Sequence, residues 1–123
     1  MAESPAMPLW TDAYLGDTTH LTTLEHGAYM LILMAMWRSG ECKLPGDDES
    51  LMRYARVGIS HWDAMASRLR RFFIDLGDGN ITQGRLLDEW EYVRRRSRRQ
   101  SHNSKARWLK NKKPQHATAF PPH

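Results

Sequence analysis

The stretch that decides the fold is DDESLMRYARVGISHWDAMASRLRRFF, residues 47–73, which contains two helical patterns in immediate succession. Asp47 stands where it would cap the first helix, and acidic residues follow in the first turn. We expect this helix to end at Gly58 and the next to begin with Ser60 as its N-cap. The second helix has an apolar face at helical spacing, formed by Trp62, Met65, Ala66, Leu69, Phe72 and Phe73. Two helices joined by a short turn that contains glycine predict a helix-turn-helix.

The residues before this stretch predict a third helix. In THLTTLEHGAYMLILMAMWRSG, residues 19–40, Thr22 and Glu25 have the spacing of a capping box, and Gly40 marks the end. Nearly every face is apolar in its second half, so we expect this helix to be central. The expected inward stripe comprises Leu24, Ala28, Leu31 and Ala35, with Ile32 and Met36 beside it.

The residues after this stretch predict a hairpin and a last helix. FFIDLGDGNITQG, residues 72–84, has short extended runs around a DGN turn. RLLDEWEYVRRR, residues 85–96, returns to helical spacing through Leu86 or Leu87, Trp90 and Val93. The whole order predicts a mainly α, winged-helix-like fold, in which the hairpin is the wing and the C-terminal helix or tail is basic.

The charge of the chain is strongly divided along its length. Residues 1–93 carry eight Lys/Arg and fourteen Asp/Glu, a formal charge of −6, whereas residues 94–113 carry ten Lys/Arg and no acidic residue. We therefore expect a flexible leader at residues 1–7, a winged-helix-like domain at 8–93 and a basic, partly disordered tail at 94–123. A polyanion or an acidic surface would relieve the repulsion within such a tail.

The composition excludes several classes of protein. A single cysteine, Cys42, permits no internal disulfide framework and fits a reducing compartment. The longest apolar run, residues 28–37, is about half of a membrane span, and the N-terminus does not resemble a secretory signal. These observations predict a cytoplasmic protein without membrane contact.

The second helix of the helix-turn-helix is the candidate for base recognition, because such helices enter the major groove of double-stranded DNA. Opposite its apolar face the sequence places five residues that could contact DNA: Ser60, His61, Ser67, Arg68 and Arg71. The alternative is an ordinary solvated surface, which Asp63 favours because it weakens attraction to phosphate.

The basic tail is the stronger signal for nucleic acid. Its cations would occupy nearly all sides of a helix, which suits contact with phosphates better than recognition of bases. The residues concerned are Arg94, Arg95, Arg96, Arg98, Arg99, Lys105, Arg107 and Lys110, followed by Lys112 and Lys113. Trp108 lies among them and could stack on a base of a single strand or pack on the domain. An acidic protein partner and a merely solvated segment are the alternatives.

Neither a metal site nor a catalytic site is indicated. His20, His26 and Cys42 lack the paired spacing of zinc ligands. The sequence has no phosphate-binding glycine loop, no His-Glu-x-x-His motif and no nucleophile elbow. We expect no cofactor, no metal and no enzymatic activity.

Several segments resemble the YdaU-like proteins of phages and prophages. The resemblance is carried by PLWTDAYLGDTTHLTTLEHGAYMLILMAMWRSG (8–40), LPGDDESLMRYARV (44–57), FFIDLGDGNITQGRLLDEW (72–90) and ARW (106–108). It implies a winged-helix-like domain of the kind found at the front of phage replication proteins, and it implies no catalytic residue. Our hypothesis is a non-enzymatic DNA-binding domain of a replication-associated phage protein. The alternative is a small module that binds a phage or host protein.

Overall fold

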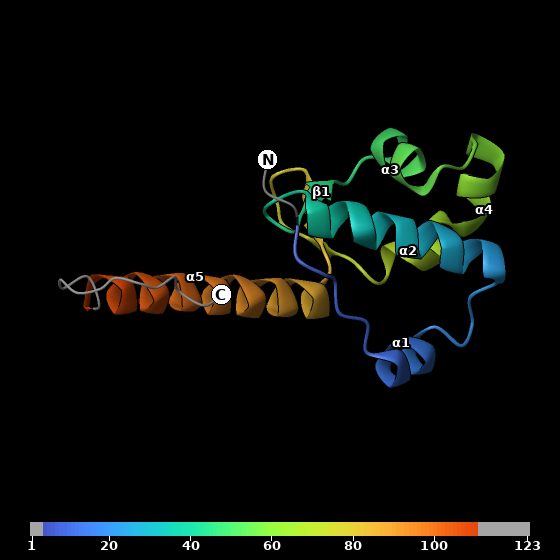
Figure 1. Ribbon diagram of the computed structural model, residues 1–123. Coiled ribbons are helices and arrows are strands. Elements are labelled where there is room, and N and C mark those ends of the chain that lie inside the picture. The colour runs from blue at the N-terminus through green and yellow to red at the C-terminus, as the bar shows by residue number, and fades with distance from the viewer. Residues whose placement is uncertain (1–3, 111–123) are drawn as a thin grey trace. The chain divides into compact units, whose positions relative to one another are not determined.

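The computed structural model describes residues 4–110, with side chains described as far as Arg99. The chain divides into two compact units, Met1–Trp90 and Glu91–His123. Five helices and three short strands occur in the described residues, so the fold is mainly α with a small sheet, as predicted (Figure 1). The part of the predicted disordered tail at residues 111–123 lies outside the described residues.

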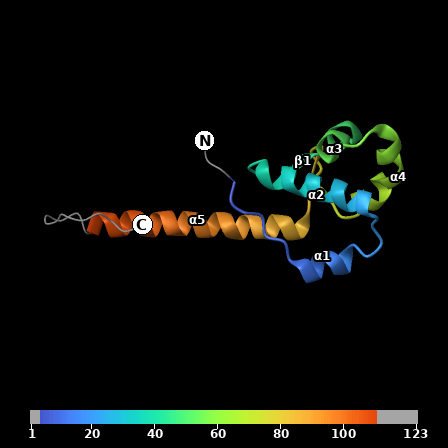
Figure 2. The same ribbon diagram turned by 45° about the vertical axis from the view of Figure 1, so that its right-hand side comes forward.

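The central helix of the first unit is α2, Thr23–Arg38. It begins with the predicted capping box: Oγ1 of Thr22 accepts a hydrogen bond from the Glu25 amide, and the Glu25 side chain accepts one from the Thr22 amide. Two of the four amides that lack an acceptor within the helix at this end are thereby satisfied. In both ribbon views α2 runs between α1, Thr11–Asp17, on one side and α3 and α4 on the other (Figures 1 and 2).

The buried stripe of α2 differs from the predicted one. Leu24 is 48% exposed, and Leu31 and Ala35 are only half-buried. Ala28, Ile32 and Met36 are buried as expected. The helix also buries Glu25, Tyr29, Leu33 and Trp37, which were not in the expected set. Because nearly every face of α2 is apolar, the pattern alone does not select the face, and the contacts with α3 and α4 decide it.

The predicted pair of helices is present as α3, Asp48–Ala55, and α4, Ile59–Arg70. Asp47 caps α3 as predicted, accepting a hydrogen bond from the Ser50 amide at 3.0 Å. The predicted boundaries in the turn were wrong: α3 ends at Ala55, and its C-cap Arg56 adopts the left-handed conformation with φ 62°. Gly58, and not Ser60, is the N-cap of α4, and no side chain caps this helix. The left-handed turn at Arg56 lets the chain leave α3 two residues before Gly58.

The three strands form one antiparallel sheet in the order β1-β3-β2. The predicted hairpin consists of β2, Ile74–Asp75, and β3, Asn80–Thr82, with Ile74 opposite Thr82. The strand β1, Leu44–Pro45, was not predicted and pairs with β3 through Leu44 opposite Ile81. It ties the connection between α2 and α3 to the hairpin.

The last helix, α5, spans Gly84–Lys110 and belongs to both units. Its first turns carry Leu86, which is buried, and Glu89, whose Oε2 accepts a hydrogen bond from Trp10 Nε1 at 2.9 Å. In the predicted leader, the Pro5 carbonyl accepts a hydrogen bond from Trp37 Nε1 at 2.7 Å. The N-terminal segment is thus held to α2 from residue 5 onward.

Candidate nucleic-acid interface

The exposed side of α4 displays most of the residues that the sequence proposed for DNA contact. Trp62, Met65 and Leu69 are buried on the other side of this helix. The proposed residues Ser60, His61, Ser67 and Arg71 are all exposed. The helical pattern therefore placed these four side chains correctly at the surface, although Arg71 follows the last residue of α4 as its C-cap.

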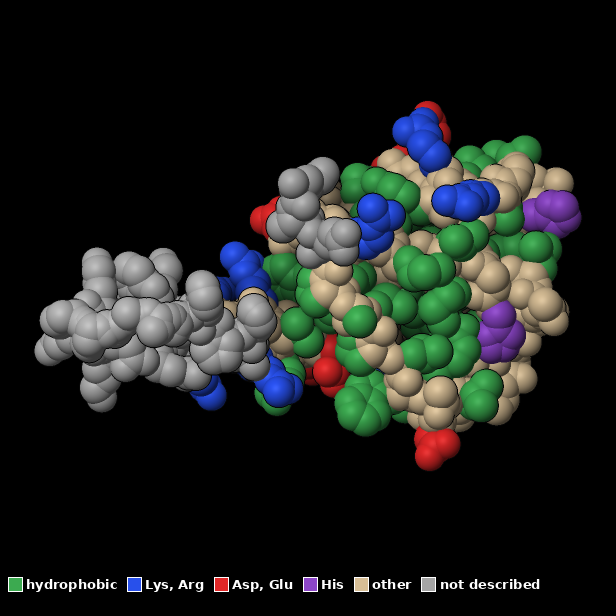
Figure 3. All heavy atoms as spheres, viewed as in Figure 1, with side chains coloured by type: hydrophobic (Ala, Val, Ile, Leu, Met, Phe, Trp, Pro, Cys, Tyr) green, Lys and Arg blue, Asp and Glu red, His purple; other side chains and the backbone are tan. Residues whose placement is uncertain are grey.

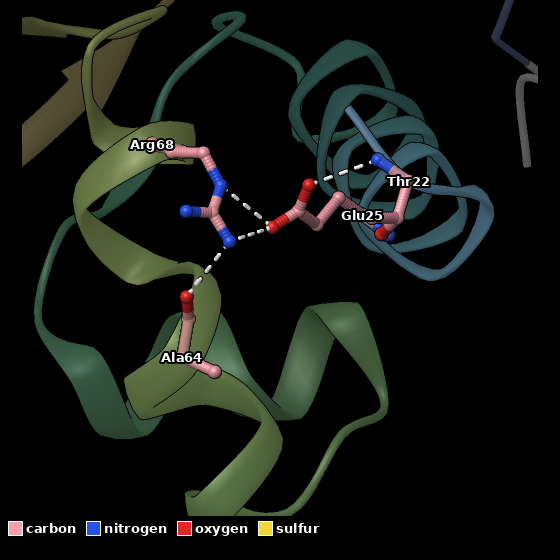
Figure 4. Close-up of polar contacts among 4 residues, drawn as sticks. All are labelled: Thr22, Glu25, Ala64 and Arg68. Atoms are coloured by element: carbon pink, nitrogen blue, oxygen red, sulfur yellow. Dashed lines mark hydrogen bonds and ion pairs between the residues drawn. The ribbon is translucent and has the colours of Figure 1, made fainter. Parts of the chain in front are cut away.

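Arg68 has a different role from the one its spacing suggests. Its Nε donates to Oε2 of Glu25 on α2 at 2.8 Å, and its Nη2 donates to the same oxygen (Figure 4). The same Nη2 also donates to the Ala64 carbonyl at 3.0 Å. The side chain of Glu25 is only 4% exposed, whereas that of Arg68 is 44% exposed. Most of the donors of Arg68 are thus committed to holding α4 against the start of α2.

Glu25 takes part in two interactions at once. One carboxylate oxygen, Oε1, accepts the Thr22 amide at 2.9 Å, and the other accepts the Arg68 guanidinium (Figure 4). The hydrogen bond from Arg68 is the main cause that lowers the pKa of Glu25 below its ordinary value, against the opposing effect of burial. Glu25 is therefore a buried anion, and Arg68 compensates its charge.

A second arginine of α4 is also engaged in the fold. Arg70 Nη2 lies 2.5 Å from Oδ1 of Asp48, and its Nη1 donates to the Gly46 carbonyl at 2.9 Å. The same Asp48 oxygen accepts Nε1 of the buried Trp62 at 2.9 Å. These hydrogen bonds, first that from Arg70, lower the pKa of Asp48. The acidic start of α3 thus anchors α4, a role that its sequence position did not reveal.

Three of the five arginines of α3, α4 and the residues that follow each helix are engaged in ion pairs. Arg68 and Arg70 are paired with Glu25 and Asp48, Arg53 is paired with Glu49, and the exposed Arg56 and Arg71 make no ion pair within the described residues. The hairpin adds Asp75 and Asp78 and no basic residue between positions 74 and 82. On the face shown in Figure 3, the Lys and Arg side chains of this unit are scattered among apolar ones. Residues 4–90 carry more acidic than basic side chains, unlike a typical phosphate-binding domain.

The arginines of α5 are arranged differently. The side chains of Arg94, Arg95, Arg96, Arg98 and Arg99 are all exposed. Within the part of the chain that the structure describes, no ion pair engages the last four of them. No acidic residue follows Glu91 in the sequence, so no carboxylate lies between or beyond these arginines along the chain. The structure places Lys105, Arg107 and Lys110 in the same helix, and their side chains lie outside the described ones.

His20, His26 and Cys42 lie in the described part of the chain. Across the described residues, no three side chains of His, Cys, Asp or Glu gather as metal ligands would. His26 Nδ1 lies 2.8 Å from the Tyr14 hydroxyl, and the His20 ring stacks on Phe72 with centroids 5.8 Å apart. Cys42 is buried. In residues 4–110, no helix has both the length and the apolar character needed to cross a bilayer.

Comparison with known proteins identifies the family. The model of a family described as "Protein of unknown function (DUF1376)" matches residues 5–91. The chain belongs to this family. A curated relative, "Uncharacterized protein YdaU" of Escherichia coli strain K12, is 34% identical over 94 residues, which are 76% of this chain and 28% of the relative. These matches confirm the YdaU-like resemblance of the sequence, and the chain spans less than a third of that relative's length. No solved structure matches the chain.

Proposed function

We propose that this protein is a non-enzymatic DNA-binding domain of winged-helix type, associated with phage or prophage replication. The replication role comes from the YdaU-like resemblance. The observation that carries the DNA-binding proposal is the run of exposed, uncompensated arginines on α5, Arg95 to Arg99. Closely spaced cations of this kind bind the phosphates of nucleic acid by releasing its counterions.

The order of elements supports the winged-helix part of the proposal. A helix, a short strand, two helices joined by a three-residue turn and a hairpin follow one another from α2 to β3. The first strand pairs with the second strand of the hairpin, which closes the sheet beside the helices. A winged helix is built in this order, with α4 in the position of the recognition helix and the hairpin in that of the wing.

The charges of the two units favour different roles for them in DNA binding. Residues 1–90 carry eight Lys/Arg and thirteen Asp/Glu, so the first unit has a formal charge of −5. Affinity for phosphate must then come from α5, while Ser60, His61, Ser67 and Arg71 on or beside α4 supply any contact with bases. Duplex DNA is the expected ligand of α4, because a recognition helix contacts the base edges in the major groove of a duplex.

The test compares two variants of the full chain that lose the same charge. One replaces Arg95, Arg96 and Arg99 with glutamine, and the control replaces Arg38, Arg53 and Arg56, which are exposed on the first unit. Duplex affinity is measured by fluorescence anisotropy over a salt series. We expect the slope of log affinity against log salt to become shallower by roughly 3 in the first variant only. Equal slopes in both variants, or no binding by the wild type at low salt, would reject the proposal.

A second candidate function is that of a protein-interaction module, and the acidic first unit favours it. The exposed side of α4 is nearly neutral and the hairpin is acidic, which is unusual for surfaces that approach phosphate. A phage or host protein with a basic surface would complement this unit. Substitutions on the exposed side of α4 distinguish the two functions. They alter DNA binding if the protein is a DNA-binding domain, and they leave DNA binding unchanged if it is a protein-interaction module.

A further inference from the structure

Tyr92 is an exposed aromatic residue at the head of the arginines on α5. Its side chain is 54% exposed, although a tyrosine ring gains by burying its apolar faces. Residues three, four and seven positions apart share one side of a helix, so Tyr92 lies on the same side as Arg95, Arg96 and Arg99. All three arginines are exposed as well. An exposed aromatic ring therefore lies at the start of a stripe of cationic side chains along one side of α5.

We infer that this stripe is a binding site for single-stranded nucleic acid, in which a base stacks on Tyr92 and the arginines bind the adjoining phosphates. The inference rests on the proposed binding of nucleic acid by α5. It adds single-stranded nucleic acid to duplex DNA as a ligand of this helix. Proteins that bind single strands without sequence preference combine these two elements, an aromatic platform and a basic track along the backbone.

The chemistry of the ring selects a single strand over a duplex. In a duplex the faces of the bases are covered by their neighbours, and only the edges are open in the grooves. A side-chain ring can then reach a base face only by opening the stack, which costs a few kcal/mol per step in proteins that wedge apolar side chains between bases. In a single strand the base faces are available without that cost. The arginines bind phosphates in either case, so Tyr92 adds affinity for the single strand alone.

The stripe also has the dimensions that such a site needs. A helix rises 1.5 Å per residue, so the side chains from Tyr92 to Arg99 extend over roughly 10 Å. That length admits a base and the phosphates next to it. The uncompensated charge of Arg95, Arg96 and Arg99 distinguishes the stripe from the α4 surface, where two arginines are neutralised.

The test uses the full chain with a labelled oligothymidine and a blunt duplex of equal length at the same low salt. Tyr92→Ala should weaken oligothymidine binding about fivefold or more and leave duplex binding unchanged. Tyr92→Phe keeps the ring and should retain the affinity of the wild type. Ser97→Ala is the control, because Ser97 is exposed on a different side of the same helix. Removing the ring should leave the slope against salt unaltered, since no phosphate contact is lost.

The outcomes separate this inference from the proposed function. If the wild type binds both probes and Tyr92→Ala binds oligothymidine as well as the wild type does, the stacking site is refuted and the phosphate-binding function stands. Equal weakening toward both probes also refutes it, because a structural loss would affect both. If neither probe binds, both proposals fail, and an acidic protein surface becomes the partner that the Tyr92 and arginine side chains fit.

Discussion

Arg68 of α4 compensates the charge of Glu25, a carboxylate buried at the start of α2, with Nε and Oε2 2.8 Å apart. The same carboxylate completes the capping box of α2 by accepting the Thr22 amide. One side chain thus links the start of the central helix α2 to α4 (Figure 4). The placement of α4 on the first unit therefore depends on a charge pair.

The first prediction concerns the stability that this pair provides. Arg68→Ala leaves the Glu25 charge, 4% exposed, without its cation. Breaking a buried pair in this way costs about 3–5 kcal/mol when both partners are buried, and we expect about 2 kcal/mol because water reaches Arg68. The matched control is Arg53→Ala, since the exposed Arg53–Glu49 pair should contribute well under about 1 kcal/mol. Urea denaturation at neutral pH measures both free energies of unfolding.

The second prediction gives the pH dependence of that difference. The pKa of folded Glu25 lies below its ordinary value of 4.5, so its contribution to stability is present above about pH 4.5 and is lost as the pH falls through the lowered value. The Arg68→Ala variant loses the hydrogen bond that lowers the pKa of Glu25 most and keeps the burial that raises it, so protonation becomes more favourable than in the wild type. The free energies of unfolding of wild type and variant should therefore converge below pH 4.5. A difference that stays constant into acid would show that Glu25 is not the group concerned.

The third prediction distinguishes the two arginines that the sequence grouped together. The side chain of Arg71 is exposed and makes no ion pair within the described residues, whereas that of Arg68 is committed to Glu25. Arg71→Ala should change the relative affinities for different duplex sequences by about 1–3 kcal/mol if α4 contacts bases. Arg68→Ala should weaken all sequences alike through its effect on stability. Selection from a random duplex pool measures the preference, and an unchanged preference in Arg71→Ala would remove α4 from the interface.

The fourth prediction concerns the close approach of the connection before α3 to the sheet. A Cβ at Gly46 would lie 2.7 Å from Cγ2 of Ile81, a buried β-branched residue in β3. Gly46→Ala should destabilise the domain by about 1–3 kcal/mol, because the strand has no room to yield. Gly16→Ala is the control, since nothing lies within 4 Å of its Cβ and alanine favours the helix. Thermal unfolding of the two variants should shift in opposite directions.

Local signals in the sequence predicted the starts of α2 and α3 correctly, whereas contacts between residues far apart in the sequence were not predicted. The capping box at Thr22 and the cap at Asp47 were predicted because each involves residues three positions apart. The Arg68–Glu25 pair joins residues 43 positions apart, and no local pattern indicates it. Arg68 therefore had the spacing of a DNA-contacting residue and the contacts of a structural one.

The same reason explains the missed strand and the wrong turn boundary. β1 has two residues, and its pairing with β3 is what makes it a strand. The turn after α3 was assigned to Gly58 because glycine is the usual residue in a left-handed helix end, yet Arg56 adopts that conformation. The exposed Tyr92 could have been found from the sequence by its position three and four residues before two arginines.

The last prediction uses that left-handed arginine. At φ 62° the side chain of Arg56 crowds its own backbone, which costs about 1–2 kcal/mol for a residue with a Cβ. Arg56→Gly removes this cost and adds chain entropy to the unfolded state, so we expect a net gain of about 0.5–1 kcal/mol. Arg53→Gly removes the same charge inside α3 and should lose about 1 kcal/mol. Urea denaturation compares the two, and a loss of stability in Arg56→Gly would mean that the arginine side chain contributes more than its conformation costs.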